Sequence, residues 1–595
     1  MQIFVNREVG VLPLQQARTR QGRSKRGLFS LTTKIYDAIV VGTGAGGGTA
    51  MKVLCEAGLK VCAINSGPRT DPAEDYRQHR QVYDLKFRGY GNPLRLEGKA
   101  HQEPYSVEES EYSEGRDLFE HDIAYSTAPG TDWYWKRCKA TGGKANFWGR
   151  SSARFGDIDF KAADLDGIGE NWPVDYAEIS PWFSKAERYM GVASTIQNRP
   201  SNPDGEYLPP MPWRCIDYII QKGAERIGVP YLPDRCAQLT VDHNNHPACH
   251  YCGNCSRGCD VGSFFSPTWF TIPDAEATKN LTLLTDALVR NVITDENGLA
   301  RGVAYIDRGT RQEVEVYAKV VVLAASCVET AHIMLNSKSR HWPTGIANSN
   351  GQLGRNLCDH LYGSPGYGYL PKLLGQPATP DNIADSTVAW MPRWQNLKNP
   401  HEEKFIRGYS VYMGGGCGEF PGYYGQIEGF GSQFKRDIKR YYPTGIGALI
   451  QAPSLPSPTN YVDIDPDKED IFGIPQLRFH FQWGQNELLM WEHSKRLMTD
   501  LFKAMGGEMW GMDDEPNRPG TSLHETGVCR FGNDSKTSVT NKWAQTHDVP
   551  NLYICDASIF PSPTDKTTTM PIIAFTMRTC DHMLNNFKQD IHKRA

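Results

Sequence analysis

Three features common in other protein classes are missing from this 595-residue sequence. It has no run of about 18 apolar residues, so we expect no transmembrane segment of its own. Its formal net charge is only -4, so it is not the strongly basic chain that is typical of nucleic-acid-binding proteins. Its composition of 39% hydrophobic and 22% charged residues excludes a disordered chain. The sequence therefore predicts a globular protein that does not bind nucleic acid.

The 15 cysteines do not form the dense framework of a small secreted domain. Four of them cluster between positions 249 and 259, and the other eleven are scattered along the chain. This distribution favours reduced thiols together with one metal site.

Charge is also unevenly placed, because residues 1–35 contain seven Lys or Arg and a single Glu. We expect residues 1–35 to be a disordered basic tail, since they lack the apolar core of a secretory signal.

Residues 36–65 predict a βαβ unit, in which an apolar strand, a glycine turn, a helix and a second strand follow one another. Gly42, Gly44 and Gly47 form the GxGxxG pattern that allows a tight turn and close approach of a pyrophosphate. The phosphates would lie at the helix N-terminus. Asn65 occupies the place of the acidic residue that usually binds the ribose. This unit predicts a dinucleotide site.

The cysteine cluster has the spacing CxxCxxCxxxC, formed by Cys249, Cys252, Cys255 and Cys259. Four thiolates this close together are typical of an iron-sulfur cluster, held by three or four ligands as 3Fe-4S or 4Fe-4S. A structural zinc site is the alternative, although its ligands more often come as two separated pairs. The spacing favours the cluster.

Further along the chain, "TGGKANFWG" contains Gly142 and Gly143, which permit backbone to approach a flat ligand. Strands are predicted between residues 280 and 325, and antiparallel sheet with long loops between 361 and 480. The C-terminal block from "GTSLHETGVCRFG" through "NLYICDASIFPSPTDK" to a final amphipathic helix is a plausible wall for a ligand cleft.

Five separated motifs together resemble the glucose-methanol-choline (GMC) flavoprotein oxidoreductases: "YDAIVVGTGAGGG", "TGGKANFWG", "VVVLAAS", "GRNLCDH" and the C-terminal block. With the cysteine run, the chain is most similar to the bacterial sugar dehydrogenase branch. The resemblance implies an α/β fold, with a Rossmann-like FAD-binding domain of discontinuous segments and an inserted α+β substrate domain built on an antiparallel sheet. The implied FAD-binding segments are residues 36–170, 280–360 and 525–595. The implied insertions are a helical and cysteine-cluster segment, 171–279, and a substrate-binding segment, 361–524.

The resemblance also implies site residues. The family's catalytic base falls on His524, and Asn146 and Asp556 fall beside the cofactor. His360 of "GRNLCDH" is expected to be a structural residue near the flavin. Phe147 stands where some relatives carry a histidine that links the flavin, which favours non-covalent FAD.

One family position departs from the pattern. A second His or Asn usually follows the "DASxFP" strand, and counting from Asp556 places Thr567 there. A threonine hydroxyl can bind the substrate oxygen, but it cannot serve as a base near neutral pH. Lys566 or Asn541 could instead supply this second polar contact.

The resemblance implies a dehydrogenase that oxidises a secondary hydroxyl or anomeric carbon of a sugar, glycoside or polyol by hydride transfer to FAD. Because a cluster carries one electron at a time, electrons would leave through it to a cytochrome c-type acceptor. Relatives imply a small signal-bearing subunit, and either a periplasmic location reached through it or a cytoplasmic one. The alternatives are a GMC oxidase-like enzyme with structural zinc and a non-catalytic FAD-binding subunit.

Overall fold

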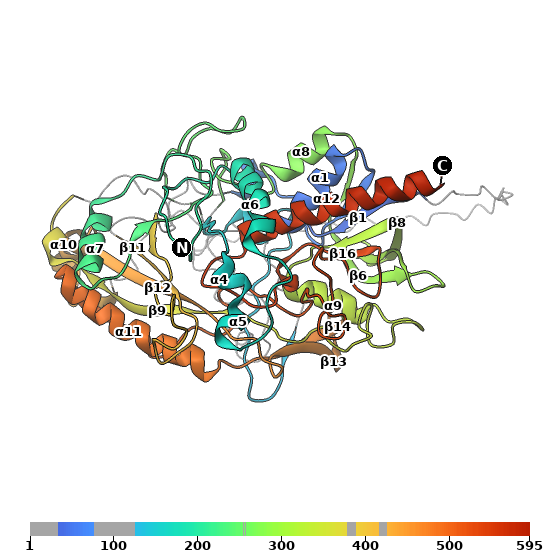
Figure 1. Ribbon diagram of the computed structural model, residues 1–595. Coiled ribbons are helices and arrows are strands. Elements are labelled where there is room, and N and C mark those ends of the chain that lie inside the picture. Colours follow the sequence, from blue (N-terminus) through green and yellow to red (C-terminus); the bar gives the residue numbers. More distant parts are fainter. Residues whose placement is uncertain are drawn as a thin grey trace, which may run out of the picture. The chain divides into compact units, whose positions relative to one another are not determined.

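The computed structural model describes residues 34–76, 125–253, 255, 258–377, 388–415 and 425–594. All but the last two residues of the predicted basic tail, 1–35, lie outside the described residues. Two large sheets, each covered by helices, organise the part described (Figure 1). The predicted α/β fold, with a nucleotide-binding sheet and an antiparallel sheet, is confirmed.

The first sheet has seven strands drawn from segments far apart in the sequence, as predicted for the FAD-binding domain. The order is β5-β2-β1-β8-β7-β6, with β16 also paired to β8. Strands β5, β2, β1, β8 and β16 pair in parallel, whereas β7 pairs antiparallel with both β8 and β6. The strands are β1 (Ile35–Val41), β2 (Val61–Ile64), β5 (Leu281–Leu284), β6 (Ala287–Thr294), β7 (Ala300–Asp307), β8 (Glu313–Leu323) and β16 (Leu552–Ile554).

Both faces of this sheet are covered by helices, which explains why its parallel strands are almost continuously apolar. On β1, Ala38 and Val40 pack into a core with α1 and α12. Ile39 and Val41 point to the opposite face and join a larger core that includes α9. The helices around this sheet are α1 (Ala45–Glu56), α6 (Tyr176–Met190), α8 (Thr271–Ala277), α9 (Cys327–Asn336) and α12 (Thr569–Arg594).

The second sheet is antiparallel throughout, in the order β15-β9-β12-β11-β10-β4. Its strands are β4 (Leu232–Pro233), β9 (His360–Tyr369), β10 (Ala389–Met391), β11 (Ser410–Gly415), β12 (Gly445–Pro453) and β15 (Glu508–Gly511). The helices α7 (Cys215–Arg226) and α11 (Gln485–Met505) cover one face, where Val411 and Met413 of β11 are buried. Because side chains alternate along a strand, Tyr412 faces the opposite side, where Tyr412 and Gly414 line a cavity.

A small third sheet, β13-β14-β3, joins segments that the predicted domains kept apart. Its strands are β3 (Ser126–Thr127), β13 (Tyr461–Glu469) and β14 (Pro475–His480). Leu477 and Phe479 pack in the same core as the first sheet, although they fall in the predicted substrate segment, 361–524. The predicted insertion, 171–279, is also divided, because its α6 contacts α12 and its α7 contacts α11.

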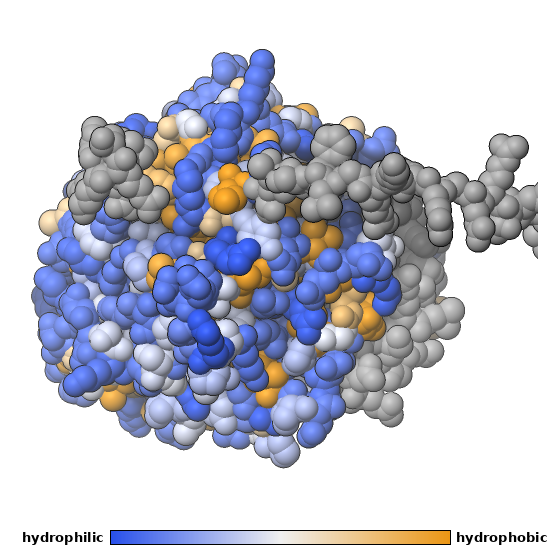
Figure 2. All heavy atoms as spheres, turned by 90° about the vertical axis from the view of Figure 1, so that its right-hand side faces the viewer, coloured by the Kyte–Doolittle hydropathy of each residue, from blue (hydrophilic) through white to orange (hydrophobic). Residues whose placement is uncertain are grey.

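The remaining short elements lie in the connections: α2 (Pro72–Asp75), α4 (Asp157–Phe160), α5 (Ala162–Asp166), α10 (Gly431–Tyr441), η3 (Gly143–Asn146), η5 (Pro371–Leu373) and η7 (Ala557–Ile559). The face seen in Figure 2 carries mainly hydrophilic residues, with hydrophobic ones scattered among them. No helix among the residues described combines the length and the apolar character needed to cross a bilayer.

Candidate functional site

A cavity of ≈ 1040 Å³ begins at the carboxyl ends of strands β1, β2, β8 and β16 and reaches the open face of the second sheet. This is where open α/β sheets bind ligands. Its lining includes the loops that follow these strands, and residues of strands β11 and β12 and of the segments 135–151 and 521–525. His524 and Thr567 line the same cavity. The fold therefore brings the predicted cofactor segment and the predicted catalytic residues to one space.

The GxGxxG turn forms one end of this cavity. Gly42 has φ +94°, and a Cβ there would lie 2.3 Å from the carbonyl oxygen of Ala324. A Cβ on Gly47 would lie 2.0 Å from the carbonyl oxygen of Gly42. Gly44, the N-cap of α1, has open space beside it, because a Cβ added there would be 3.9 Å from its nearest neighbour. The turn therefore leaves the helix N-terminus uncovered for an anionic group, which fits the pyrophosphate of FAD.

Asn65 lines the cavity at the end of β2, but the protein already uses most of its amide. Its Nδ2 donates to the carbonyl oxygens of Gly67 (3.1 Å) and Lys139 (2.7 Å). Its Oδ1 accepts from Thr43 Oγ1 at 2.9 Å. Asn65 thus ties the first glycine turn to the 139–143 loop, and only a lone pair of Oδ1 is left to accept a ribose hydroxyl.

Gly142 and Gly143, the second pair of glycines in the site, have different roles. Gly143 lines the cavity, whereas a Cβ on Gly142 would lie 2.3 Å from Oδ1 of Asn146. Asn146 itself is fully buried and is not part of the cavity wall. It donates to the carbonyl oxygen of Thr141 (2.9 Å) and accepts from Thr268 Oγ1 (2.8 Å). Asn146 therefore holds the shape of this loop instead of facing the cofactor space.

Asp556 follows β16 and lines the cavity. It accepts from the backbone and hydroxyl of Ser558 (2.9 and 2.6 Å) and from Thr330 Oγ1 (2.5 Å). Burial raises the pKa of Asp556, and the hydrogen bonds lower it in part, so that it is about 6. Together with the uncovered N-terminus of α1 and the glycine turn, this wall fits FAD, whose phosphates would be held by the backbone at the start of α1.

His524 is paired with His360, and the two Nδ1 atoms lie 2.9 Å apart. Nε2 of His360 lies 2.5 Å from the carbonyl oxygen of Thr564. Because a carbonyl only accepts, Nε2 of His360 carries a proton. Burial lowers the pKa of His360 to about 4, so at neutral pH its Nδ1 has no proton and accepts.

The tautomer of His524 follows from this pairing. Its Nδ1 must donate to His360, which leaves Nε2 without a proton. No group in the described part of the chain hydrogen-bonds to this Nε2, and His524 lines the cavity. Burial, then the neighbouring His360 and Lys144, hold the pKa of His524 well below 6.5. His524 is therefore a neutral imidazole with one nitrogen lone pair available to a ligand.

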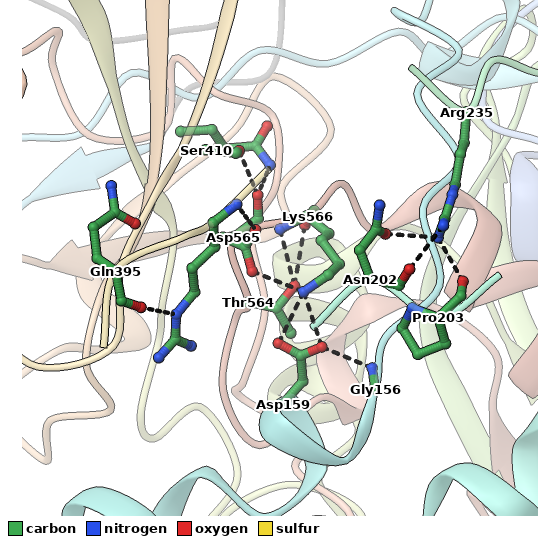
Figure 3. A network of polar contacts seen from close by, with 12 residues as sticks. Gly156, Asp159, Asn202, Pro203, Arg235, Gln395, Ser410, Thr564, Asp565 and Lys566 are labelled. Carbon is green, nitrogen blue, oxygen red and sulfur yellow. Dashed lines mark hydrogen bonds and ion pairs between the residues drawn. The ribbon is translucent and has the colours of Figure 1, made fainter. Parts of the chain in front are cut away.

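Thr567 also lines the cavity, and its Oγ1 donates to the carbonyl oxygen of Ser151 at 2.6 Å. The preceding Lys566 is buried between Asp159 (3.0 Å) and Asp565 (2.7 Å), as Figure 3 shows. Burial lowers the pKa of Lys566, but the attraction of the two carboxylates is stronger and raises it overall. This ammonium fixes the loop and does not line the cavity.

Asn541, the other alternative to Thr567, does not line the cavity either. Its Nδ2 donates to Gln545, and its Oδ1 accepts from the backbone of Trp543 at 2.8 Å. Of the three candidates for the second polar contact, the structure brings only Thr567 to the wall that holds His524.

The four clustered cysteines lie in a loop behind the cavity wall. Cys255 and Cys259 pack with Phe264 and with Trp148, which lines the cavity. The thiol of Cys249 accepts from Gln238 Nε2 (2.8 Å), and that of Cys259 from the backbone of Ser263 (3.3 Å). Within the described residues, which include all four cysteines, no three His, Cys, Asp or Glu side chains are close enough together to hold a metal ion. The sulfur positions therefore do not form the cage that the spacing predicts.

Sequence reasoning missed the partners of the predicted catalytic residues. His360 was expected to be only structural, yet it contacts His524. Its place in the "GRNLCDH" motif was the available signal. Tyr412 and Ser151 line the cavity and hydrogen-bond to each other at 3.1 Å. No motif marks Tyr412, because only the register of β11 turns it toward the cavity.

Comparison with known proteins agrees with this architecture. Two family models described as GMC oxidoreductase match residues 213–362 and 456–576. The chain is 25% identical to 2-methyl-1,2-propanediol dehydrogenase of Mycolicibacterium austroafricanum, covering 94% of this chain and 97% of that protein. It is also 25% identical to the fructose dehydrogenase large subunit of Gluconobacter japonicus, covering 94% and 100%. The gluconate 2-dehydrogenase flavoprotein of Pantoea cypripedii is 25% identical as well, covering 91% and 92%.

Solved structures share the fold at lower identity. A formate oxidase superposes with a TM-score of 0.61 at 14% identity, covering 94% of this chain and 99% of that one. Pyridoxine 4-oxidase from Mesorbium loti superposes with a TM-score of 0.58 at 16% identity, covering 92% and 99%.

Proposed function

We propose that this chain, which belongs to the GMC oxidoreductases, oxidises a sugar, glycoside or polyol at a secondary hydroxyl or anomeric carbon. The GMC oxidoreductases are FAD-dependent enzymes that act on CH–OH donors. The observation that carries the proposal is the free Nε2 of His524 in the wall of the cofactor cavity. When bound, FAD supplies the two-electron acceptor that takes a hydride from the substrate carbon.

The residues of the chain account for the proton. Oxidation of an alcohol to a carbonyl releases one hydride from carbon and one proton from oxygen. Nε2 of His524 takes the hydroxyl proton, while its Nδ1 proton stays in the bond to His360. The lowered pKa of His524 keeps the imidazole neutral before reaction and makes it release the proton readily afterwards.

Support for the substrate class comes from the relatives and from the cavity. Three relatives that align over nearly their whole length are named as dehydrogenases of a diol, of fructose and of gluconate. The substrate end of the cavity carries several hydroxyl groups, from Tyr412, Ser522 and Thr567 among others. Such groups can hydrogen-bond a polyhydroxy compound.

A second part of the proposal is that the Cys249–Cys259 loop binds an iron-sulfur cluster. The spacing of four cysteines and the contact of the loop with Trp148, a cavity residue, support it. The separated sulfur positions oppose it. We assign no step of substrate oxidation to this loop.

Partners and location belong to the same proposal. One relative is named as a large subunit, which supports a further subunit for this chain. We propose that this subunit carries an export signal, that a cytochrome c-type protein accepts the electrons, and that the assembly is periplasmic. Copurification with tagged protein from native cells and separation of periplasm from cytoplasm test these points, and an isolated cytoplasmic chain would contradict them.

The catalytic proposal is tested by anaerobic stopped-flow measurement of flavin bleaching with a panel of sugars and polyols. We expect bleaching by at least one of them. His524→Ala should slow it by about 100-fold or more while FAD stays bound. Bleaching by no member of the panel would favour a non-catalytic FAD-binding subunit, and equal rates in variant and parent would remove His524 from the chemistry.

The cluster is tested by iron, zinc and acid-labile sulfide analysis of protein purified without oxygen. Cys252→Ser should lose the iron, and Cys215→Ser, an exposed cysteine outside the run, is the matched control. Zinc in place of iron would favour the oxidase-like alternative, and protein with neither metal would refute a metal site.

A further inference from the structure

A chain of hydrogen bonds runs from a buried carboxylate to the cavity wall. Asp234 Oδ1 accepts from the backbone of Arg235 (2.7 Å) and from Ser151 Oγ (3.0 Å). Ser151 Oγ lies 3.1 Å from the hydroxyl of Tyr412. Ser151 and Tyr412 line the cavity, whereas Asp234 is buried behind them, with 3% of its surface exposed.

The direction of this chain is fixed. Ser151 has one hydroxyl proton, and it is donated to Asp234, so the bond between Ser151 and Tyr412 must use the proton of Tyr412. Burial raises the pKa of Tyr412 well above 10, so this proton is present at any physiological pH. Tyr412 therefore offers its oxygen lone pairs, and no proton, to a ligand in the cavity.

Protonation of Asp234 does not reverse this direction. Burial raises the pKa of Asp234 to about 7, which places its titration near neutral pH. Both of its hydrogen bonds reach Oδ1, and Oδ2 has no partner among the described residues. A proton would therefore occupy Oδ2, and Oδ1 would go on accepting from Ser151.

Two other cavity groups are acceptors for the same kind of reason. The hydroxyl proton of Thr567 is donated to the carbonyl oxygen of Ser151. The Nδ1 proton of His524 is donated to His360, which leaves Nε2 as an acceptor. His524, Thr567 and Tyr412 thus present three acceptors to one cavity, each with its own proton already committed to the protein. Buried acceptors require donors from the ligand, because an unsatisfied one loses free energy.

We propose that Tyr412, held by Ser151 and Asp234, is a specificity-determining residue that accepts a hydrogen bond from a second hydroxyl of the substrate. His524 takes the proton of the reacting hydroxyl, and Tyr412 recognises another hydroxyl of the same molecule. The preferred substrates are accordingly compounds with at least two hydroxyl groups, and alcohols with a single hydroxyl are poor substrates. This inference rests on the proposed function and adds the residue that recognises the second hydroxyl.

The test compares propane-1,2-diol with propan-2-ol, which share the secondary carbinol and differ by one hydroxyl. Anaerobic flavin reduction by the holoenzyme gives the apparent affinity and the limiting rate for each. We expect the diol to be preferred, and Tyr412→Phe to weaken its apparent affinity by about 5- to 10-fold, the value of one hydrogen bond. Tyr412→Phe should weaken the apparent affinity for propan-2-ol less than that for the diol, because propan-2-ol has no second hydroxyl to donate to Tyr412.

Tyr317→Phe is the matched control, because it removes a phenol hydroxyl that hydrogen-bonds Glu315 away from the cavity. An equal effect of Tyr412→Phe on both alcohols, or no effect on either, would overturn the inference and leave the oxidoreductase assignment standing. Flavin reduced by sugars but not by the diol would overturn it as well. Flavin that no alcohol or sugar reduces would instead contradict the proposed function itself.

Discussion

His360 and His524 meet through their Nδ1 atoms at 2.9 Å, although 164 positions separate them in the sequence. His360 is anchored on its other side by the carbonyl oxygen of Thr564. The pair therefore forms a relay of fixed direction, in which a backbone carbonyl determines where His524 carries its proton. His360 is a positioning residue for the proposed base.

Replacing His360 tests this role. His360→Phe keeps an aromatic ring in the buried space but removes the acceptor for the Nδ1 proton of His524. We expect flavin reduction to slow by about 10- to 100-fold, since general-base catalysis of this kind contributes roughly 10²–10⁴-fold and only its orientation is lost. His360→Gln, which retains a donor and an acceptor, should be slowed less. Stopped-flow traces that are identical for the parent and His360→Phe would show that the pair has no part in proton transfer.

The pH dependence of flavin reduction should reflect the same pair. Because the pKa of His524 lies well below 6.5, the base stays neutral across physiological pH, and the limiting rate should be flat there. The rate should fall only well below pH 6.5, as His524 becomes protonated. A loss of rate centred above pH 7 would show that another group limits the reaction.

The buried histidines also predict how stability depends on pH. The pKa of His360 is about 4 in the folded protein and about 6.5 when unfolded, so between these values the unfolded chain binds more protons. The contribution of His360 to stability is therefore expected to decrease as pH falls from about 6.5 to 4, whereas the raised pKa of buried carboxyls such as Asp556 acts in the opposite direction. Urea unfolding at several pH values measures this slope, and His360→Phe should reduce it. An unchanged slope in that variant would assign the dependence to other groups.

The glycine turn gives a prediction about cofactor binding. Gly42→Ala places a Cβ 2.3 Å from the carbonyl oxygen of Ala324, so the turn must move away from the position that suits a pyrophosphate. Purified variant should contain much less FAD, with affinity reduced by about 10-fold or more. Gly58→Ala is the control, because its φ of +88° imposes similar backbone strain, yet a Cβ there meets nothing within 4 Å. Equal flavin absorbance in both variants would contradict the role of Gly42.

Local sequence patterns predicted individual strands and helices, but they did not predict which strands pair with each other in the fold. The βαβ unit around Gly42 and Gly44 was evident because its glycines and apolar periods are adjacent in sequence. By contrast, β14 pairs with β3 more than 300 positions earlier and joins the core of the first sheet. The sequence of a short strand does not indicate its pairing partner, because its residues resemble those of other short strands.

The same limit applied within the site. His524 was predicted from its family motif. Which of its nitrogens carries the proton depends, through His360, on the backbone carbonyl of Thr564, and the sequence does not show where a backbone carbonyl will lie. Asn65 and Asn146 were predicted to contact the cofactor. Their amides turned out to bond chiefly to the protein, which depends on loop contacts that spacing alone does not reveal.

The ion group around Lys566 predicts a large effect on stability. Its ammonium lies between Asp159 and Asp565, and all three side chains are at most 2% exposed. Ser410 Oγ and Gln451 Nε2 donate to the backbone carbonyl of Asp565, at 2.6 and 3.1 Å, so the group also holds the Thr564–Thr567 loop against the second sheet. The loop that anchors His360 therefore depends on a buried ion group of one ammonium and two carboxyl groups.

Lys566→Met removes the ammonium of this trio and leaves two buried carboxyl groups without their ion-pair partner. Breaking a buried ion group in this way costs about 3–5 kcal/mol, which urea unfolding of the holoenzyme would detect. Lys161→Met is the matched control, because that lysine is 52% exposed and lies 3.8 Å from Asp157, an arrangement that contributes little. If the two variants unfold at the same urea concentration, the buried group does not stabilise the loop. If Lys566→Met is destabilised as expected, its flavin reduction should also be slower, because the carbonyl of Thr564 is then no longer held where His360 needs it.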